Sequence, residues 1–338
     1  MTKRILYIGN DLQINSFTAT YISFFSKVLK REGYRVKTAS TRNNKGLRLM
    51  EMLGLIVRFH KSTDVVLIDT YGAMNFYYAY LVAKTCQFYN LEYIPILHGG
   101  NLPERLEASG KFSKSLFGKA KMNVAPSLFL YEIFKGAGFD NIKLIPNSIE
   151  IDNYPFKERK KFSPRLLWVR RFQKRYNPML ALKVLQKLTK EYPNASLCMV
   201  GPDKDGSMKA CKTFAKKHSL DVKFTGKLKK KEWAELSEDY DFFINTTTID
   251  NTPISVIEAM SLGLAVVSTN VGGMPVLIEN NKDGILVPEN DAGKMTEAII
   301  RLLEHPEETA EICHNARKKV EKFAWQLVRE DWNRLLES

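Results

Sequence analysis

Cysteine and long apolar runs are scarce in this chain of 338 residues. Its four cysteines, Cys86, Cys198, Cys211 and Cys313, lie far apart and match neither a disulfide framework nor a metal-binding motif. A reducing compartment is therefore expected. The longest apolar stretches, LGLIV and MNFYYAYLVA, are much shorter than the ~20 residues of a membrane span. The opening MTKRILYIGN has too short an apolar run for a signal peptide. We expect a cytoplasmic protein that contacts a membrane only peripherally, on its inner face.

Acidic residues are also in deficit, and the formal net charge is +14. Residues 27–61 contain ten Lys and Arg but only two acidic residues, and a second concentration, of lysines, lies within residues 204–231. Basic surfaces of this kind suit nucleic acid, anionic lipid or phosphorylated substrates, and charge alone does not choose among them. The 44% hydrophobic content excludes a disordered chain.

Two domains are expected, because this length exceeds the size at which one hydrophobic core keeps growing. Strand-like runs alternate with helical patterns (near residues 17–32, 45–60, 75–90 and 128–136) from RILYIG to KLIPN. The polar stretch 147–164 interrupts the alternation as a linker, and RLLWV restarts it. This pattern predicts an α/β fold with two doubly wound, Rossmann-like parallel sheets facing a cleft. The predicted domains are residues 1–155 and 156–315, with a helix at 316–338 crossing back to the first.

The segment TTIDNTPISVIEAMSLG contains an unusual helix. Thr252 is expected to cap it, Pro253 to be its first residue and Gly263 to follow its end. The helix is apolar on most sides, and only Ser255 and Glu258 share a polar stripe. A buried carboxylate is costly unless hydrogen-bond donors reach it, and the two hydroxyls of a sugar diol supply such donors.

The loop before this helix offers further contacts. Asp250 could orient a second polyol, and the N–H groups at the helix start favour a phosphate. Together these features predict a sugar-nucleotide site. The alternative is that Ser255 and Glu258 form a capping box and that Asp250 bonds to its own turn, but Thr252 and Pro253 already occupy the helix entry.

The stretch DNTPISVIE, from Asp250 to Glu258, resembles the paired acidic signature of retaining glycosyltransferases of family 4, which have the GT-B fold. Blocks that resemble the same family occur in order along nearly the whole chain: LHGGNLP, VAPSLFLYEIFKGAGFDNIKLIPNSI, LLWVRRFQKRYNP, CMVGPD, VKFTGKL and VSTNVGGMPVLI. The resemblance implies that Glu258 binds the ribose hydroxyls of the donor and that Asp250, where the family usually has Glu, faces the transferred sugar. Asn251, Thr252 and Pro253 would lie beside the sugar or the phosphates.

The family also has an arginine and a lysine that hold the diphosphate, and here the matching segment is VRRFQKRYNP. Arg170 or Arg171 can take the first role and Lys174 or Arg175 the second, since a tyrosine stands where a strict alignment has lysine. Arg170 and Lys174 are the preferred pair, with Arg171 also near the donor. Cations aimed at developing charge contribute a large part of catalysis. Alone, the segment would read as a solvated basic loop.

Three further sites follow from the resemblance. His98, before a glycine pair at the end of a strand, would meet the donor sugar near the leaving group. Gly9 follows the first strand, but Asn15 and Ser16 stand where the family has glycines that approach the phosphates. Gly272 and Gly273 keep the family's glycine pattern, with a plain turn as the alternative.

The predicted activity is transfer of a sugar, with retention at the anomeric carbon, from a nucleoside diphosphate sugar to a saccharide or lipid-linked acceptor, without metal or cofactor. Residues 45–61 would form a basic, amphipathic helix on an anionic membrane, or an ordinary packed helix. A nucleic-acid-binding protein is disfavoured because no basic helix interleaved with aromatic residues is present. A sugar-nucleotide epimerase would need acid and base groups that the sequence does not place.

Overall fold

The computed structural model describes residues 3–10, 21–40, 42 and 44–338. The chain divides into two compact units: unit 1 comprises Met1–Pro146 and Arg329–Ser338, and unit 2 comprises Asn147–Val328.

The unit boundaries differ from the predicted ones at 155 and 316. Residues 147–164 are not a free linker, because Ile149 and Tyr154 are buried in the core of unit 2. At the other end, Ala316 and Val320 belong to the same core, so the segment that belongs to unit 1 begins only at Arg329.

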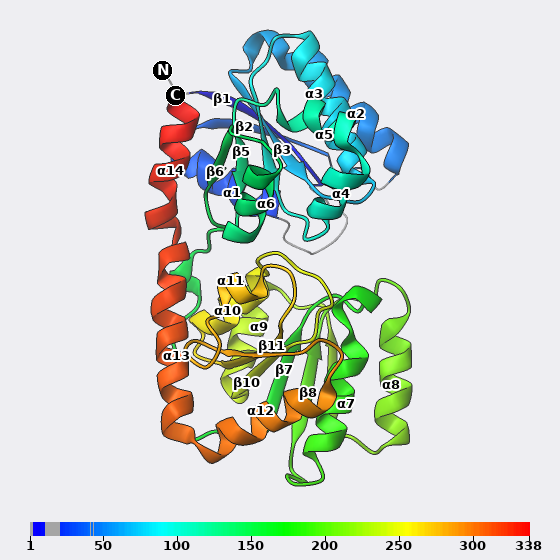
Figure 1. Ribbon diagram of the computed structural model, residues 1–338, viewed down its shortest axis with the longest axis vertical. Coiled ribbons are helices and arrows are strands. Elements are labelled where there is room, and N and C mark those ends of the chain that lie inside the picture. Colours follow the sequence, from blue (N-terminus) through cyan, green and yellow to red (C-terminus); the bar gives the residue numbers. More distant parts are fainter. Residues whose placement is uncertain (1–2, 11–20, 41, 43) are drawn as a thin grey trace. The chain divides into compact units, whose positions relative to one another are not determined.

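Unit 1 contains a six-stranded parallel sheet with the order β2-β1-β3-β4-β5-β6 (Figure 1). Its strands are β1 (Arg4–Ile8), β2 (Arg35–Ala39), β3 (Val65–Thr70), β4 (Tyr93–Leu97), β5 (Asn123–Ala125) and β6 (Ile142–Leu144). Its helices are α1 (Tyr21–Arg31), α2 (Lys45–Phe59), α3 (Asn75–Phe88), α4 (Leu102–Ala108), α5 (Gly110–Phe117), α6 (Leu128–Gly136) and the part of α14 (Trp325–Glu337) from Arg329 onward.

Helices cover both faces of this sheet, which explains why β3 and β4 are buried along their whole length and are apolar except for Asp69 and Thr70 at the end of β3. Helix α3 packs against both α2 and α5. Elsewhere the ring of Phe25 in α1 lies 4.6 Å from that of Trp332 in α14. The last helix is therefore part of the core of unit 1.

Unit 2 contains a second six-stranded parallel sheet, with the order β12-β11-β10-β7-β8-β9. Its strands are β7 (Arg165–Val169), β8 (Ser196–Val200), β9 (Val222–Gly226), β10 (Phe242–Asn245), β11 (Ala265–Thr269) and β12 (Ile285–Val287). Its helices are α7 (Pro178–Leu188), α8 (Ser207–Lys217), α9 (Lys230–Leu236), α10 (Ile254–Ser261), α11 (Met274–Leu277), α12 (Ala292–Glu304) and α13 (Pro306–Val320).

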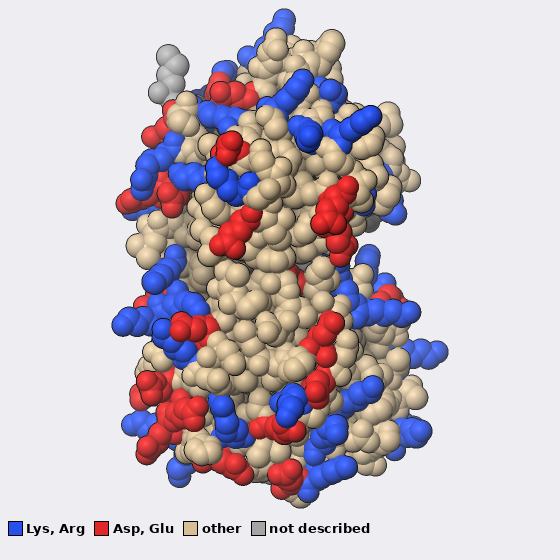
Figure 2. Space-filling view, viewed as in Figure 1, with Lys and Arg blue, Asp and Glu red and all other residues tan. Residues whose placement is uncertain are grey.

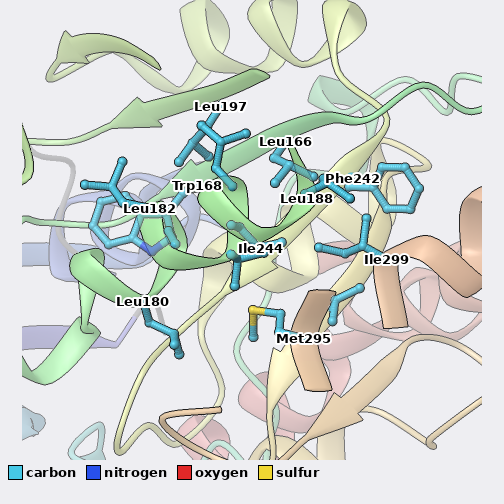
Figure 3. Packing of buried hydrophobic residues seen from close by; sticks show 14 of the residues in the cluster. Leu166, Trp168, Leu180, Leu182, Leu188, Leu197, Phe242, Ile244, Met295 and Ile299 are labelled. Atoms are coloured by element: carbon cyan, nitrogen blue, oxygen red, sulfur yellow. The ribbon is translucent and has the colours of Figure 1, made fainter. Parts of the chain in front are cut away.

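Alternate residues of the strands of unit 2 face two separate cores, as the twofold period of a strand requires. Phe242 and Ile244 of β10 point to one face, where side chains of β7, β8, α7 and α12 pack with them (Figure 3). Phe243, between them, packs on the opposite face with residues of α9, α10 and α13. The predicted fold class, two doubly wound parallel sheets, is confirmed.

The structure can be compared with what the composition predicted about basic surfaces, cysteines and membrane spans. Basic and acidic side chains are interspersed over the face seen in Figure 2, so the excess charge is not gathered into one basic patch there. All four cysteines are buried and free. In the part of the chain that the structure describes, no helix combines the length and the apolar character needed to cross a membrane.

Candidate functional site

Helix α10 begins one residue later than predicted. The backbone of Pro253 is extended (φ −70°, ψ 119°), so Pro253 is the N-cap and Ile254 the first helical residue. The prediction that Thr252 caps the helix is therefore wrong, and no side chain makes a cap bond. That result also excludes the capping-box alternative for Ser255 and Glu258. Gly263, in the left-handed conformation at φ +74°, follows the helix end as expected.

Glu258 is a buried carboxylate with hydrogen bonds on only one side. Its Oε1 accepts from the Tyr154 hydroxyl at 2.5 Å and from the Lys230 ammonium at 2.7 Å. None of the hydrogen bonds among the described residues involves Oε2. Ser255, three residues earlier on the same face of α10, has a buried Oγ that also lacks a partner there. Two polar groups in one place are thus left with hydrogen-bonding capacity.

Tyr154 is a dependable donor to Glu258. Burial, reinforced by the negative charge of Glu258, raises the pKa of Tyr154 well above its ordinary value. The phenol therefore keeps its proton throughout the physiological range. Neither Tyr154 nor Lys230 emerged from the sequence as a site residue. The only signal was that Lys230 belongs to the lysine concentration at 204–231.

The carboxyl edge of β7 brings Arg170 to Asp250. The Arg170 guanidinium donates to the Asp250 carboxylate, and its centre lies 4.9 Å from the ring of Tyr176. Its Nε is buried and has no partner among the described residues. Asp250 also accepts from the backbone N–H of Asn251 at 2.9 Å. The predicted cation and the predicted sugar-facing carboxylate are therefore neighbours.

Gly272 and Gly273 support the loop that contains Asp250. A Cβ at position 272 would lie 2.1 Å from the carbonyl oxygen of Asp250, and one at position 273 would lie 2.2 Å from that of Asn251. Gly272 also has φ +54°. The pair is thus a close-packing contact rather than a plain turn, and it fixes the loop next to the start of α10.

Lys174 and Arg171, two other candidates after β7, make different contacts. Lys174 lines a hollow of about 330 Å³ together with Asp205 and Gly206, and its backbone N–H donates to Asp205 at 2.9 Å. The Arg171 guanidinium donates to the Tyr176 hydroxyl at 3.4 Å. No contact in the described part of the chain joins the Lys174 side chain to Arg170 or Asp250. The sequence predicted the arginine and the carboxylate as site residues, and the structure joins this pair without Lys174.

Unit 1 has its own polar cluster, at the carboxyl edge of β3 and β4. His98 Nε2 lies 2.8 Å from Asp69 Oδ1, the same oxygen that accepts from the Tyr7 hydroxyl at 2.7 Å. The rings of Tyr71 and Tyr21 flank the imidazole, with centroids at 5.3 and 5.0 Å. Burial, and then the charge of Asp69, raise the pKa of Tyr7 well above its ordinary value, so Tyr7 donates.

Asp69 was missed by the sequence reasoning, although a single acidic residue near the end of a buried strand is a signal for a site at that edge. Gly9 makes room for it, because a Cβ at position 9 would lie 2.5 Å from Asp69 Oδ2. This packing is the role that the structure describes for Gly9. Asn15 and Ser16 lie outside the described residues.

Comparisons with known proteins identify the family and the fold. The sequence model of the glycosyl transferases group 1 family matches residues 150–319. The chain is 27% identical to the amylovoran biosynthesis glycosyltransferase AmsK of Erwinia amylovora over 244 residues, which cover 68% of this chain and 59% of AmsK. It is 36% identical to the putative colanic acid biosynthesis glycosyltransferase WcaL of Escherichia coli over 92 residues, which cover 27% of this chain and 23% of WcaL. The chain thus spans less than two thirds of each of these curated relatives.

A solved structure extends the likeness to the whole fold. HepE of Anabaena, in complex with UDP and glucose, superimposes with a TM-score of 0.78 over 99% of this chain and all of HepE, at 17% identity. The fold is therefore GT-B. Because the family match covers half of the sequence, including the loop before α10 and Glu258, the chain belongs to the glycosyl transferases group 1 family.

Proposed function

We propose that the protein is a retaining glycosyltransferase of family 4 that transfers a sugar from a nucleoside diphosphate sugar to a saccharide or lipid-linked acceptor. The observation that carries the proposal is the buried carboxylate of Glu258, whose two hydrogen bonds both fall on Oε1, together with the Ser255 hydroxyl, which has no partner among the described residues. A carboxylate in this state is stabilised by a ligand with two adjacent hydroxyls, and the ribose of a nucleotide is such a ligand.

The charges in the loop before α10 suit departure of a diphosphate. Arg170 is the proposed counter-ion, and its buried Nε offers a further donor. Asp250, which holds the guanidinium, would contact the transferred sugar. In the proposed reaction the bond between the anomeric carbon and the diphosphate oxygen breaks. The acceptor oxygen then bonds to the same face of that carbon, and its proton passes to the departing diphosphate. Stabilisation of the leaving negative charge is the main contribution of the protein.

His98 is proposed to contact the donor sugar. Its bond to Asp69 fixes the ring, and the Tyr71 and Tyr21 rings restrict its rotation. An imidazole held in this way can present its other nitrogen to a sugar hydroxyl without losing further conformational freedom.

The relatives support a role in polysaccharide biosynthesis. AmsK and WcaL are described as glycosyltransferases of amylovoran and colanic acid biosynthesis, and HepE was solved with UDP and glucose. We infer that this chain acts on a surface polysaccharide or related glycoconjugate and takes a nucleotide sugar as donor.

Helix α2 is proposed to contact an anionic membrane surface. Met52 and Ile56 face the core, whereas Leu47 and Met50 are 55% and 69% exposed. Lys45 and Arg58 near its two ends are also exposed, as is Lys61 in the turn that follows it. Apolar and basic side chains together on one exposed helix match the pattern of an interfacial helix. Charge reversal of Lys45, Arg48, Arg58 and Lys61 is expected to abolish sedimentation with anionic vesicles, and unchanged sedimentation would remove the idea.

A thermal-shift panel of nucleotide sugars tests the central proposal. A bound donor at a hundred times its Kd should raise the Tm by about 5 °C or more, while oligonucleotides should leave it unchanged. Transfer from a labelled donor should persist in EDTA. A strict need for divalent ions would contradict the metal-independent mechanism, and inversion of the anomeric configuration in the product would contradict retention.

A further inference from the structure

The two hydrogen bonds to Glu258 fall on a single oxygen. Tyr154 and Lys230 both donate to Oε1, although a carboxylate offers about four acceptor positions divided between two oxygens. Donors on one oxygen fix the position of the whole group and leave the other oxygen able to accept. The pattern is that of a group held in place for a ligand rather than of a fully paired structural charge.

Tyr154 is firmly attached to the body of unit 2. Its ring packs near that of Trp233 in α9, with centroids 6.4 Å apart. The Arg317 guanidinium donates to the Tyr154 carbonyl at 2.8 Å and to the Ser261 carbonyl at 2.9 Å. Because Ser261 is the last residue of α10, Arg317 fixes the tyrosine relative to the helix that contains Glu258.

Lys230 approaches Glu258 from the start of α9. The first turn of this helix is set by the bond from the Lys229 backbone N–H to the Glu232 carboxylate at 2.6 Å. The Lys230 side chain is 44% exposed, while that of Glu258 is 5% exposed. The ammonium thus lies where the site opens to solvent. It places a positive charge beside a carboxylate that is otherwise buried.

We propose that Tyr154 and Lys230 are positioning residues for recognition of the ribose: they fix Oε1 of Glu258 so that Oε2 accepts hydrogen bonds from the ribose hydroxyls. This inference rests on the proposed function. It names two residues that contribute to affinity through Glu258 rather than by touching the ligand. Their contribution therefore exists only when the ligand has ribose hydroxyls.

Calorimetric titration of the full chain with UDP, GDP and ADP identifies the nucleotide that binds most tightly. That nucleotide and its 2′,3′-dideoxy analogue are then titrated into the wild type and into Tyr154→Phe and Lys230→Met variants. Each variant should bind the ribonucleotide about tenfold more weakly, the effect of one lost charge-assisted hydrogen bond. The Kd of the dideoxy analogue should be the same within about twofold for the wild type and both variants, because this ligand has no ribose hydroxyls for Glu258 to accept from. Lys230→Arg should recover most of the loss.

A neighbouring lysine provides the matched control. Lys231 is 88% exposed and lies 3.7 Å from Glu235 at the surface, so Lys231→Met removes the same charge from the same helix turn. It should bind both ligands as the wild type does. Melting curves of all variants check that the fold is retained.

The possible results separate the inference from the proposed function. Wild type that binds none of the three nucleotides overturns both. The inference alone is overturned if the wild type binds the ribonucleotide more tightly than the dideoxy analogue and both variants bind the ribonucleotide as tightly as the wild type does. A loss of equal size for the ribonucleotide and the dideoxy analogue also overturns it, because a general structural defect does not depend on the ribose hydroxyls.

Discussion

Each unit buries one carboxylate that accepts from a tyrosine and a basic side chain on the same oxygen. In unit 1, Asp69 is bonded by Tyr7 and His98. In unit 2, Glu258 is bonded by Tyr154 and Lys230. The two clusters therefore share one arrangement of donors on unrelated segments of the chain.

The clusters differ in the exposure of the basic side chain, and by this measure the cluster of unit 1 is closed and that of unit 2 is open. The His98 side chain is only 7% exposed, whereas that of Lys230 is 44% exposed. The second oxygen of Asp69 lies against Gly9, while the helix of Glu258 also has the Ser255 hydroxyl, for which the described part of the chain provides no partner. The closed cluster holds an imidazole in place, and the open cluster is the one proposed to bind a ligand. Under that proposal the same chemistry would serve orientation in one place and binding in the other.

The largest effect is expected where unit 2 meets the leaving group. Arg170→Met should lower kcat by about 10²–10³-fold, because one preorganised group that stabilises developing charge is removed. Measured transfer rates at saturating donor provide the test. Arg171→Met, which alters the neighbouring exposed arginine, should change kcat much less. Equal losses in the two variants would contradict the assignment of Arg170.

Removal of the Glu258 carboxylate should weaken nucleotide binding more than it lowers the rate of catalysis. Glu258→Ala is expected to weaken nucleotide binding by about 10²-fold or more, since two charge-assisted hydrogen bonds to the ligand are lost. Isothermal titration measures the change. A nucleotide affinity within a few-fold of wild type would show that ribose is recognised elsewhere, and the contrast between the two clusters would disappear.

The closed cluster can be disturbed without touching its donors. Gly9→Ala introduces a Cβ where Asp69 Oδ2 now lies and should destabilise the protein by ~2 kcal/mol through overpacking. Denaturant unfolding gives the difference. Gly54→Ala in α2, where a Cβ would contact nothing within 4 Å, should be neutral or slightly stabilising. A neutral Gly9→Ala would mean that the cluster is looser than described.

The smallest change in rate is expected from Asp69→Asn. The amide still fills the space but no longer holds the imidazole with a charge, so the rate should fall by about tenfold, the lower end of the loss found for groups that orient metal-binding histidines. Nucleotide affinity should stay within about twofold. A loss of affinity as large as that of Glu258→Ala would assign binding, not orientation, to unit 1.

Most features that depend on residues close together in the sequence were predicted correctly. The alternation of apolar runs gave both sheets, and helical periodicity placed Ser255 and Glu258 on one face of a buried helix. The end of that helix at Gly263 was also predictable from residue type alone. Its start was not, because Pro253 is compatible with both the cap and the first turn, and only the observed ψ of 119° distinguishes them.

The partners of the site residues could not be predicted in the same way. Tyr154 and Lys230 are 104 and 28 residues from Glu258 in sequence, and only the packed structure brings them together. Tyr154 was assigned to a linker because its surroundings are polar and charged, although its own ring is buried. The choice of Arg170 over its neighbours likewise depends on which side chain the end of β7 directs toward Asp250.

The segment Arg329–Ser338 belongs to unit 1 but is the last part of the chain to be synthesised. Trp332, Leu335 and Leu336 are buried, and Tyr34 bonds to Asn333 at 3.0 Å. During synthesis the first 146 residues therefore leave the ribosome long before the side chains that complete their core have been made. Unit 2, which is continuous in sequence, can fold before unit 1 is complete. Removal of Trp332 and the residues after it should leave the earlier-made unit exposed to proteases and chaperones even though its own sheet is intact.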